Sequence, residues 1–223
     1  MATTIHEPPQ IENIRSLDSS GGGGFRDLVP AGGSLRAVGD HPLAPSQTGI
    51  WVALAAITMS FAALTSAMVV RQGTGMDWQH IALPPILFLN SLVLAASSAT
   101  LEVARRRIAS YARGAEKRLT APMSWLVTTL GLGLLFVVGQ YAAWLRLKAE
   151  RLYLATNPNS SFFYLLTGLH AIHVLGGLAG LVYVMSKLKR SILRRSTFAA
   201  AAQYWHFMGL LWLYLLGLLW IKL

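Results

Sequence analysis

Residues 162–184 read FFYLLTGLHAIHVLGGLAGLVYV, an apolar run that contains no acidic or strongly basic side chain. A helix needs about 20 apolar residues to cross the hydrocarbon core of a bilayer, and this run is long enough. It lacks the strict alternation of apolar and polar residues that the wall of a membrane barrel requires, so it predicts a transmembrane helix. Two histidines, His170 and His173, lie three residues apart inside it.

The composition of the whole chain agrees with a membrane protein. Its 223 residues have a mean hydropathy of +0.48, and 54% of them are hydrophobic while only 13% are charged. Such a chain is too apolar for an ordinary soluble domain of this length. The net charge of +10 gathers largely in short segments between apolar runs, which indicates membrane orientation rather than nucleic-acid binding.

Five apolar stretches predict an all-α membrane protein with five transmembrane helices in a bundle. We expect these helices near residues 49–70, 83–105, 122–147, 161–187 and 198–222. The segments RRRIASYARGAEKR (105–118) and KLKRSILRR (187–195) are short and strongly basic, so both should face the cytoplasm. This assignment places the N-terminus on the cytoplasmic side and the C-terminus on the outer side.

Residues 1–47 differ from the rest of the chain. They are rich in Gly, Pro and Ser and show no sustained periodicity, so they predict a disordered cytoplasmic tail before a five-helix domain at 48–223. The first residues, MATTIHEPPQIENIRS, are polar and mildly acidic, which does not fit a cleavable signal. We expect the internal helices to direct membrane insertion.

Few polar side chains lie inside the predicted spans, and each is a functional candidate because such groups are costly in a bilayer. The inventory is Asn90 with Ser97, Ser98 and Thr100, then Gln140, His170, His173 and His206. Asn90, Gln140 and His170 lie at a similar depth, which suggests a buried polar layer. Glu102 lies at the inner end of its span beside Arg105, so a carboxylate proton relay is not encoded.

Histidine is the candidate ligand for a haem or metal here, since the chain has no cysteine and no carboxylate lies at the same depth. At ~1.5 Å per residue, His206 lies about 10–12 Å from the cytoplasmic end of its span and His170 about 20–25 Å from that side. One iron cannot reach both. His170 and His173 share one helix face, so they cannot bind opposite sides of a haem. We therefore expect no catalytic, cofactor or metal site in this chain, and neutral histidines that hydrogen-bond across helices.

Glycines and tryptophans are expected to serve packing and anchoring. Gly176 and Gly180 form a G-x-x-x-G spacing that admits a neighbouring helix or a lipid tail, and further small positions are Gly131, Gly133 and Gly139. Trp205 is among several aromatic residues near span ends that suit the interfacial belt of a membrane protein.

Two pairs of segments are similar to a known family. The stretch SSFFYLLTGLHAIHVLGGL (160–178), followed by YWHFMGLLWLYLLGLLW (204–220), resembles subunit III of the haem-copper terminal oxidases. LPPILFLNSLVLAASSATLEVARR (83–106) and LGLGLLFVVGQYAAWLRL (130–147) resemble two further helices of that family. The resemblance covers about residues 48–223 and fits the short, five-helix bacterial form.

The resemblance implies a non-catalytic subunit of a proton-pumping cytochrome c oxidase in the bacterial inner membrane. In this family the subunit packs on subunit I, beside subunit II, binds phospholipid and supports proton uptake and stability. Haem and copper are expected in the partner subunits. In this chain Asn90, Gln140, the three membrane histidines, Gly176, Gly180 and Trp205 are candidates for helix contacts or for a lipid cleft.

The chain departs from the family pattern at acidic positions. Where many members carry a membrane glutamate, this sequence reads Pro84 and Pro85 or Ala143, and Gly209 stands in place of an acidic residue after YWHF. Proton or lipid-amine chemistry at these positions therefore does not carry over. Two alternatives stay open: a subunit-III-like partner of nitric oxide reductase, and a small transporter or channel, although no internal repeat supports the latter.

Overall fold

The computed structural model describes residues 45–74, 85–112, 120–149, 158–190, 193 and 195–222. Its regular structure consists of α1 (Pro45–Thr74), α2 (Ile86–Ala112), α3 (Thr120–Ala149), α4 (Pro158–Lys189) and α5 (Arg195–Lys222). Each helix is long and apolar enough to cross a membrane. The prediction of an all-α fold with five membrane-spanning helices is thereby confirmed. The predicted tail lies outside the described residues, apart from residues 45–47, which begin α1.

The helix ends follow from local chemistry. Pro45 and Pro158 stand at the first positions of α1 and α4, where the missing N–H of proline costs nothing. The helix α2 continues past its apolar span to Ala112, although the sequence predicted a basic loop from residue 105. Glu102 supports this extension by accepting hydrogen bonds from Arg105, with a Nε–Oε2 distance of 2.7 Å, and from Arg106 one turn away.

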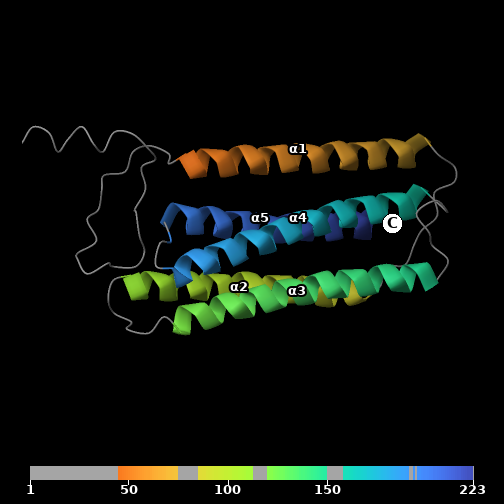
Figure 1. Ribbon diagram of the computed structural model, residues 1–223. Helices are drawn as coiled ribbons and strands as arrows, with labels where there is room; N and C mark the ends of the chain where they lie inside the picture. The colour runs from red at the N-terminus through yellow and green to blue at the C-terminus, as the bar shows by residue number, and fades with distance from the viewer. Residues whose placement is uncertain are drawn as a thin grey trace, which may run out of the picture.

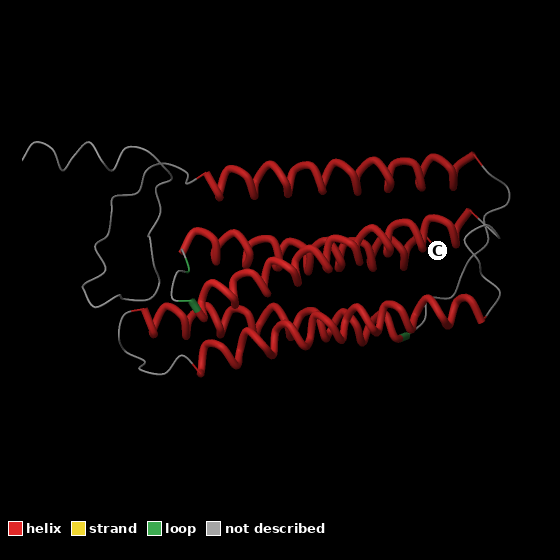
Figure 2. Tube along the Cα trace, viewed as in Figure 1, coloured by secondary structure: helices red, strands yellow, loops and turns green. Residues whose placement is uncertain are grey.

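The helices lie side by side in three groups (Figure 1). The helix α1 lies on one side, α4 and α5 lie in the middle, and α2 and α3 lie on the opposite side. The trace in Figure 2 shows the same order, with the described connections confined to the helix ends. Within the described residues, α2 packs on α3 and α5, whereas α1 contacts α4 and α5 but neither α2 nor α3. The helix α1 is also the least buried of the five.

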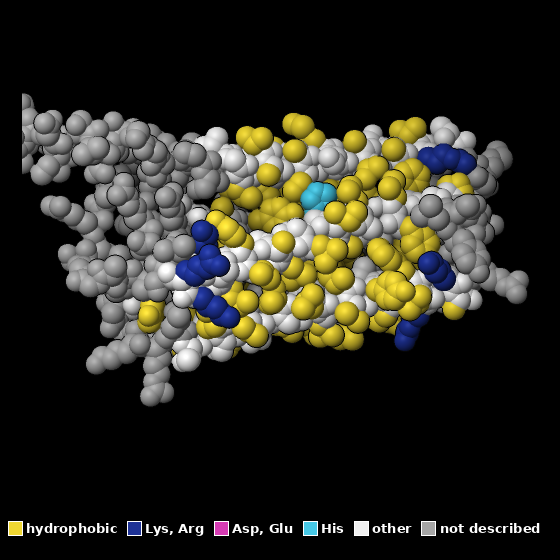
Figure 3. Space-filling view, in the orientation of Figure 1, with side chains coloured by type: hydrophobic (Ala, Val, Ile, Leu, Met, Phe, Trp, Pro, Cys, Tyr) yellow, Lys and Arg dark blue, Asp and Glu magenta, His cyan; other side chains and the backbone are white. Residues whose placement is uncertain are grey.

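The surface of the bundle is apolar along its middle. Figure 3 shows hydrophobic side chains over the central part of one face, with Lys and Arg side chains near both ends. Large residues such as Met59, Ile172 and Leu210 are more than half exposed, while Phe136, Trp205 and Trp212 are buried between helices. This distribution is that of a protein whose outer surface meets lipid and whose charged ends meet water.

Candidate functional site

Hydrogen bonds from tryptophan N–H groups join α5 to α2. The indole Nε1 of Trp205 donates to Ser97 Oγ at 3.1 Å, and that of Trp212 donates to Ser91 Oγ at 2.8 Å. An indole N–H buried in a bilayer needs an acceptor, because lipid chains offer none. The two bonds lie about two turns apart on antiparallel helices and hold them in register.

Similar bonds join the other helices. Trp144 Nε1 donates to Thr167 Oγ1 at 3.1 Å between α3 and α4, and the hydroxyl groups of Tyr214 and Thr65 lie 3.1 Å apart between α5 and α1. These pairs were not predicted from the sequence. Their signal is the abundance of Trp and Tyr in spans that also carry Ser and Thr, but the sequence does not indicate which donor meets which hydroxyl.

Trp205 occupies the centre of the packing rather than the membrane surface. Its side chain is 1% exposed and lies against glycines on two neighbouring helices. A Cβ added to Gly133 on α3 would lie 2.7 Å from Trp205 Cη2, and one added to Gly177 on α4 would lie 3.1 Å from Trp205 Cε3. The placement of Trp205 in an interfacial belt is therefore corrected: its ring is buried between helices, and the two glycines leave room for it.

His170 is enclosed by aromatic rings. It is fully buried, its ring centroid lies 5.9 Å from that of Phe136 and 5.1 Å from that of Trp212, and neither ring nitrogen has a hydrogen-bond partner among the described residues. The expected hydrogen bond across helices is thus not formed within the described bundle. The two rings that flank His170, those of Phe136 and Trp212, carry no metal-ligating atom.

Asn90 and Gln140 approach the same place from α2 and α3. Asn90 Nδ2 donates to the carbonyl of Phe136 at 3.5 Å. Gln140 follows Phe136 by one helical turn and is 1% exposed, but its amide nitrogen and oxygen have no partner in the described residues. Asn90 and His170 therefore both contact Phe136, and Gln140 lies one helical turn further along α3.

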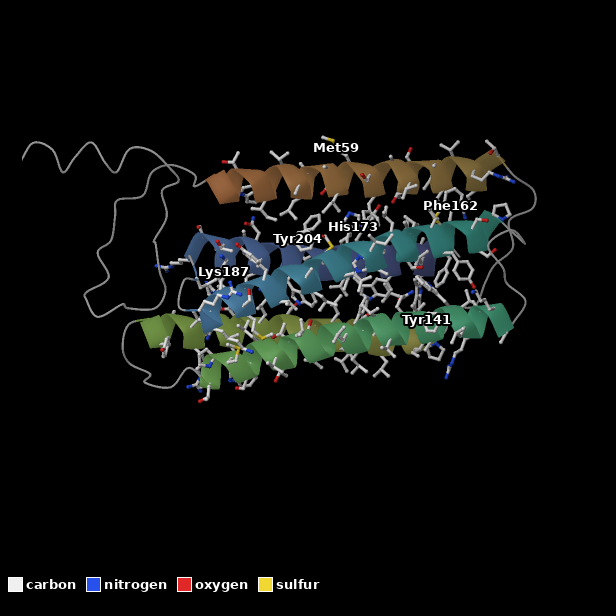
Figure 4. The ribbon with its side chains drawn as sticks, viewed as in Figure 1. Met59, Tyr141, Phe162, His173, Lys187 and Tyr204 are labelled. Atoms are coloured by element: carbon white, nitrogen blue, oxygen red, sulfur yellow. The ribbon has the colours of Figure 1, made fainter. Side chains whose placement is uncertain are left out.

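His173 has different surroundings from His170. Its Nδ1 lies 2.8 Å from the Leu169 carbonyl, and its own carbonyl accepts a 2.9 Å hydrogen bond from the Tyr204 hydroxyl. The Phe61 ring of α1 lies 5.8 Å from the His173 ring between centroids. Figure 4 shows His173 in the seam between α1 and α4, with Tyr204 nearby.

Among the described residues, grooves open between α2 and α5 and between α3 and α4. One, of about 340 Å³ between α2 and α5, is lined by His206, Ser98 and Gly209 among others, and His206 is half-buried there. The other, of about 570 Å³ between α3 and α4, runs over Gln140, Trp144 and neighbouring apolar side chains. The three membrane histidines thus occupy three separate environments.

The predicted glycines also differ among themselves. A Cβ on Gly176 would lie 3.6 Å from the Tyr204 hydroxyl, while one on Gly180 or Gly131 would meet nothing within 4 Å. The closest approaches are at Gly133, at Gly139, where a Cβ would overlap the Asn90 amide, and at Gly177. Gly177 was missed because it falls outside the G-x-x-x-G spacing.

The described part of the chain is a multi-pass helical membrane protein in which several interior polar groups, among them Ser97, Thr167 and Asn90, bond to a neighbouring helix. Among the described residues, no three or more His, Asp or Glu side chains gather as metal ligands. Phe136, Trp205 and Trp212 fill the space between the polar groups.

Comparison with known proteins identifies the family of membrane proteins to which the chain belongs. The family model for cytochrome c oxidase subunit III matches residues 49–222, and the chain belongs to that family. A probable cytochrome c oxidase subunit 3 from Mycobacterium leprae is 31% identical over 177 residues, which cover 74% of this chain and 81% of that protein. A counterpart from Nocardia farcinica is 34% identical over 92 residues, or 40% of this chain and 45% of that protein.

A less similar relative matches a comparable share of this chain. Cytochrome c oxidase subunit 3 of Synechocystis sp. is 28% identical over 184 residues, which are 78% of this chain and 74% of that protein. The resemblance seen in the sequence is confirmed by these matches. Membership of this family implies a place in a multi-subunit oxidase complex.

Proposed function

We propose that the chain is a non-catalytic integral subunit of a proton-pumping cytochrome c oxidase in the bacterial inner membrane. The observation that carries this proposal is the family match over residues 49–222, which spans all five helices. Subunit I is the proposed main contact, with subunit II also in the complex. Haem and copper belong to these partners, so oxygen is reduced outside this chain.

The packing of the bundle supports a structural role. Indole–hydroxyl bonds such as Trp205–Ser97 and Trp144–Thr167 tie neighbouring helices together, and this gives a rigid apolar surface for other subunits. The grooves of about 340 and 570 Å³ are open and largely apolar, and we propose that phospholipid chains occupy them. Ordered lipid at these positions extends the surface that the neighbouring subunits meet.

Support of proton uptake is proposed to be indirect. Within the described residues the acidic side chain is Glu102, which lies near the basic end of α2 and pairs with Arg105 and Arg106. A carboxylate held in two ion pairs is a poor proton carrier, because protonation must break both pairs. The chain therefore acts by positioning its neighbours and their lipids, with its basic segments on the cytoplasmic side.

Purification tests the proposal directly. A tagged chain extracted in mild detergent should bring haem-copper subunits with it, visible in a reduced-minus-oxidised spectrum and as oxygen uptake. A colourless protein that purifies alone would overturn the proposal. Single replacements of His170, His173 and His206 by Leu should leave the haem content of each assembled complex unchanged, because none of these histidines is proposed to bind iron.

A further inference from the structure

One hydrogen-bonding side chain on the outside of the bundle lies near the middle of the membrane. His173 follows Pro158 by 15 residues and precedes Lys189 by 16, so it is about 22–24 Å from either end of α4. The hydrocarbon core of a bilayer is about 30 Å thick, which places His173 near its centre.

The His173 side chain is open to the surroundings of the bundle. It is partly exposed, and Figure 4 places it in the seam between α1 and α4. Figure 3, drawn in the same orientation, shows a histidine side chain on the surface of this seam, surrounded by hydrophobic residues. The Phe61 ring of α1 lies 5.8 Å from the His173 ring between centroids, and the His173 side chain remains partly exposed beside it.

The hydrogen bond at Nδ1 determines whether the other ring nitrogen, Nε2, acts as a donor or as an acceptor. A carbonyl oxygen only accepts, so the 2.8 Å contact with the Leu169 carbonyl puts the proton on Nδ1. The neutral ring then presents Nε2 as an acceptor. No donor to Nε2 comes from the described residues, since the nearby Tyr204 hydroxyl is bonded to the His173 carbonyl instead.

A hydrogen-bond acceptor that faces hydrocarbon without a donor costs free energy. The group that contacts His173 Nε2 should therefore supply a donor. Lipid chains have none, and lipid headgroups lie about 15 Å away from the bilayer centre. A neighbouring transmembrane helix can place a hydroxyl or amide at this depth. On the same face of α4, Gly176 is exposed and Gly180 would accept a Cβ without meeting any atom within 4 Å, so a second backbone can come near.

We propose that the face formed by His173, Gly176 and Gly180 on α4 and by Phe61 on α1, here the His173 face, docks a transmembrane helix of a neighbouring oxidase subunit. That helix carries a hydroxyl or amide donor at the bilayer centre, bonded to His173 Nε2. This inference rests on the proposed function, because the partner is another subunit of the complex.

The chain contains no cysteine, so a single introduced cysteine carries a photo-crosslinker at one known position. Gly180→Cys probes the His173 face, and Gly131→Cys on α3 is the matched control. Both positions have free space and lie at similar depths, about 14 and 17 Å from the basic end of the bundle. In the assembled complex, Gly180→Cys should crosslink to a subunit and Gly131→Cys to lipid. Lipid adducts alone at position 180 overturn the proposal.

Variants of His173 test the hydrogen bond. His173→Leu should weaken retention of the chain in the complex about three- to tenfold, as expected for one interhelical hydrogen bond in a membrane. His173→Gln retains an acceptor and should restore part of the loss, and Val182→Ile, at an exposed position on the opposite side of α4, should have no effect. The melting temperature of the isolated His173→Leu subunit should change little, because the lost Nδ1 contact lies within α4 and joins no second helix. Equal retention of the Leu variant and the unaltered chain overturns the proposed bond.

The two proposals fail in different ways. A chain that purifies without haem-copper subunits contradicts the proposed function. A complex that assembles normally but crosslinks at position 131 and not at position 180 contradicts only the His173 face.

Discussion

At the scale of single residues, the buried polar side chains differ in whether their hydrogen bonds are made. Ser97 accepts from Trp205, and Asn90 donates to the Phe136 carbonyl. His170 and Gln140, equally buried, have no partner within the described residues. A buried polar group without a partner costs free energy, so the second pair is where substitution should be tolerated best.

Gln140→Leu is predicted to leave the stability of the isolated subunit unchanged or to raise its free energy of unfolding by up to about 1 kcal/mol. Leucine has a similar volume and removes two unsatisfied atoms. Asn90→Leu is the control, and it should lower the free energy of unfolding by about 0.5–1.5 kcal/mol because it removes a formed bond. Thermal unfolding in one detergent compares the two. A large loss for Gln140→Leu would show that its amide is bonded after all, and that the polar layer has a structural role.

The sequence could identify these residues but not their partners. Asn90, Gln140 and His170 are conspicuous because polar side chains are rare in apolar runs. Their common neighbour is Phe136, an ordinary apolar residue that carries no signal of its own. Likewise Trp205 and Trp220 both lie in α5, yet one is 1% exposed and the other 64%, and only the packing of neighbouring helices separates them.

At the scale of helix pairs, the indole–hydroxyl bonds between α5 and α2 should show energetic coupling. The double variant Trp205→Phe/Ser97→Ala should lose less free energy of unfolding than the two single variants lose together. The difference should be about 0.6–1.7 kcal/mol. Strict additivity would mean that the 3.1 Å contact contributes nothing. Trp51→Phe, at an exposed position on α1, is the control and should leave stability unchanged.

Close packing around Trp205 predicts opposite outcomes for two glycines on α3. Gly133→Ala puts a methyl group 2.7 Å from the Trp205 ring, which must shift, so the free energy of unfolding should fall by about 1–3 kcal/mol. Gly131→Ala meets no atom within 4 Å and should be neutral or slightly stabilising, since alanine favours helix. Unfolding of both variants side by side checks the difference. Equal effects would contradict the role of Gly133 as a slot for the ring.

At the scale of the whole molecule, the distribution of basic residues predicts the topology. Two single-cysteine variants test this topology: Ala115→Cys, between α2 and α3, and Thr156→Cys, between α3 and α4. A membrane-impermeant maleimide should label these two cysteines from opposite sides of the membrane. In intact cells the Thr156→Cys variant should react, whereas Ala115→Cys should react only after the inner membrane is permeabilised. The reverse pattern would contradict a cytoplasmic N-terminus.

The architecture was predictable in part for a physical reason. The length of an apolar run is a property of the sequence alone, so the existence of five spanning helices could be inferred. Which helices pair could not, because lipid-facing and protein-facing sides are both apolar in a membrane and no amphipathic stripe marks the inside. The separation of α1 from α2, its neighbour in sequence, is such an unpredicted feature.

Within the described residues α1 makes no contact with α2, and this affects the order in which the helices can pack. Of the five described helices α1 is synthesised first, yet its contacts within the described bundle are with α4 and α5, which follow the other two. The hairpin of α2 and α3 can form as soon as both have left the ribosome. The helix α1, by contrast, has its contact partners only once α4 and α5 have been synthesised, so the described bundle can close only after α5 has left the ribosome.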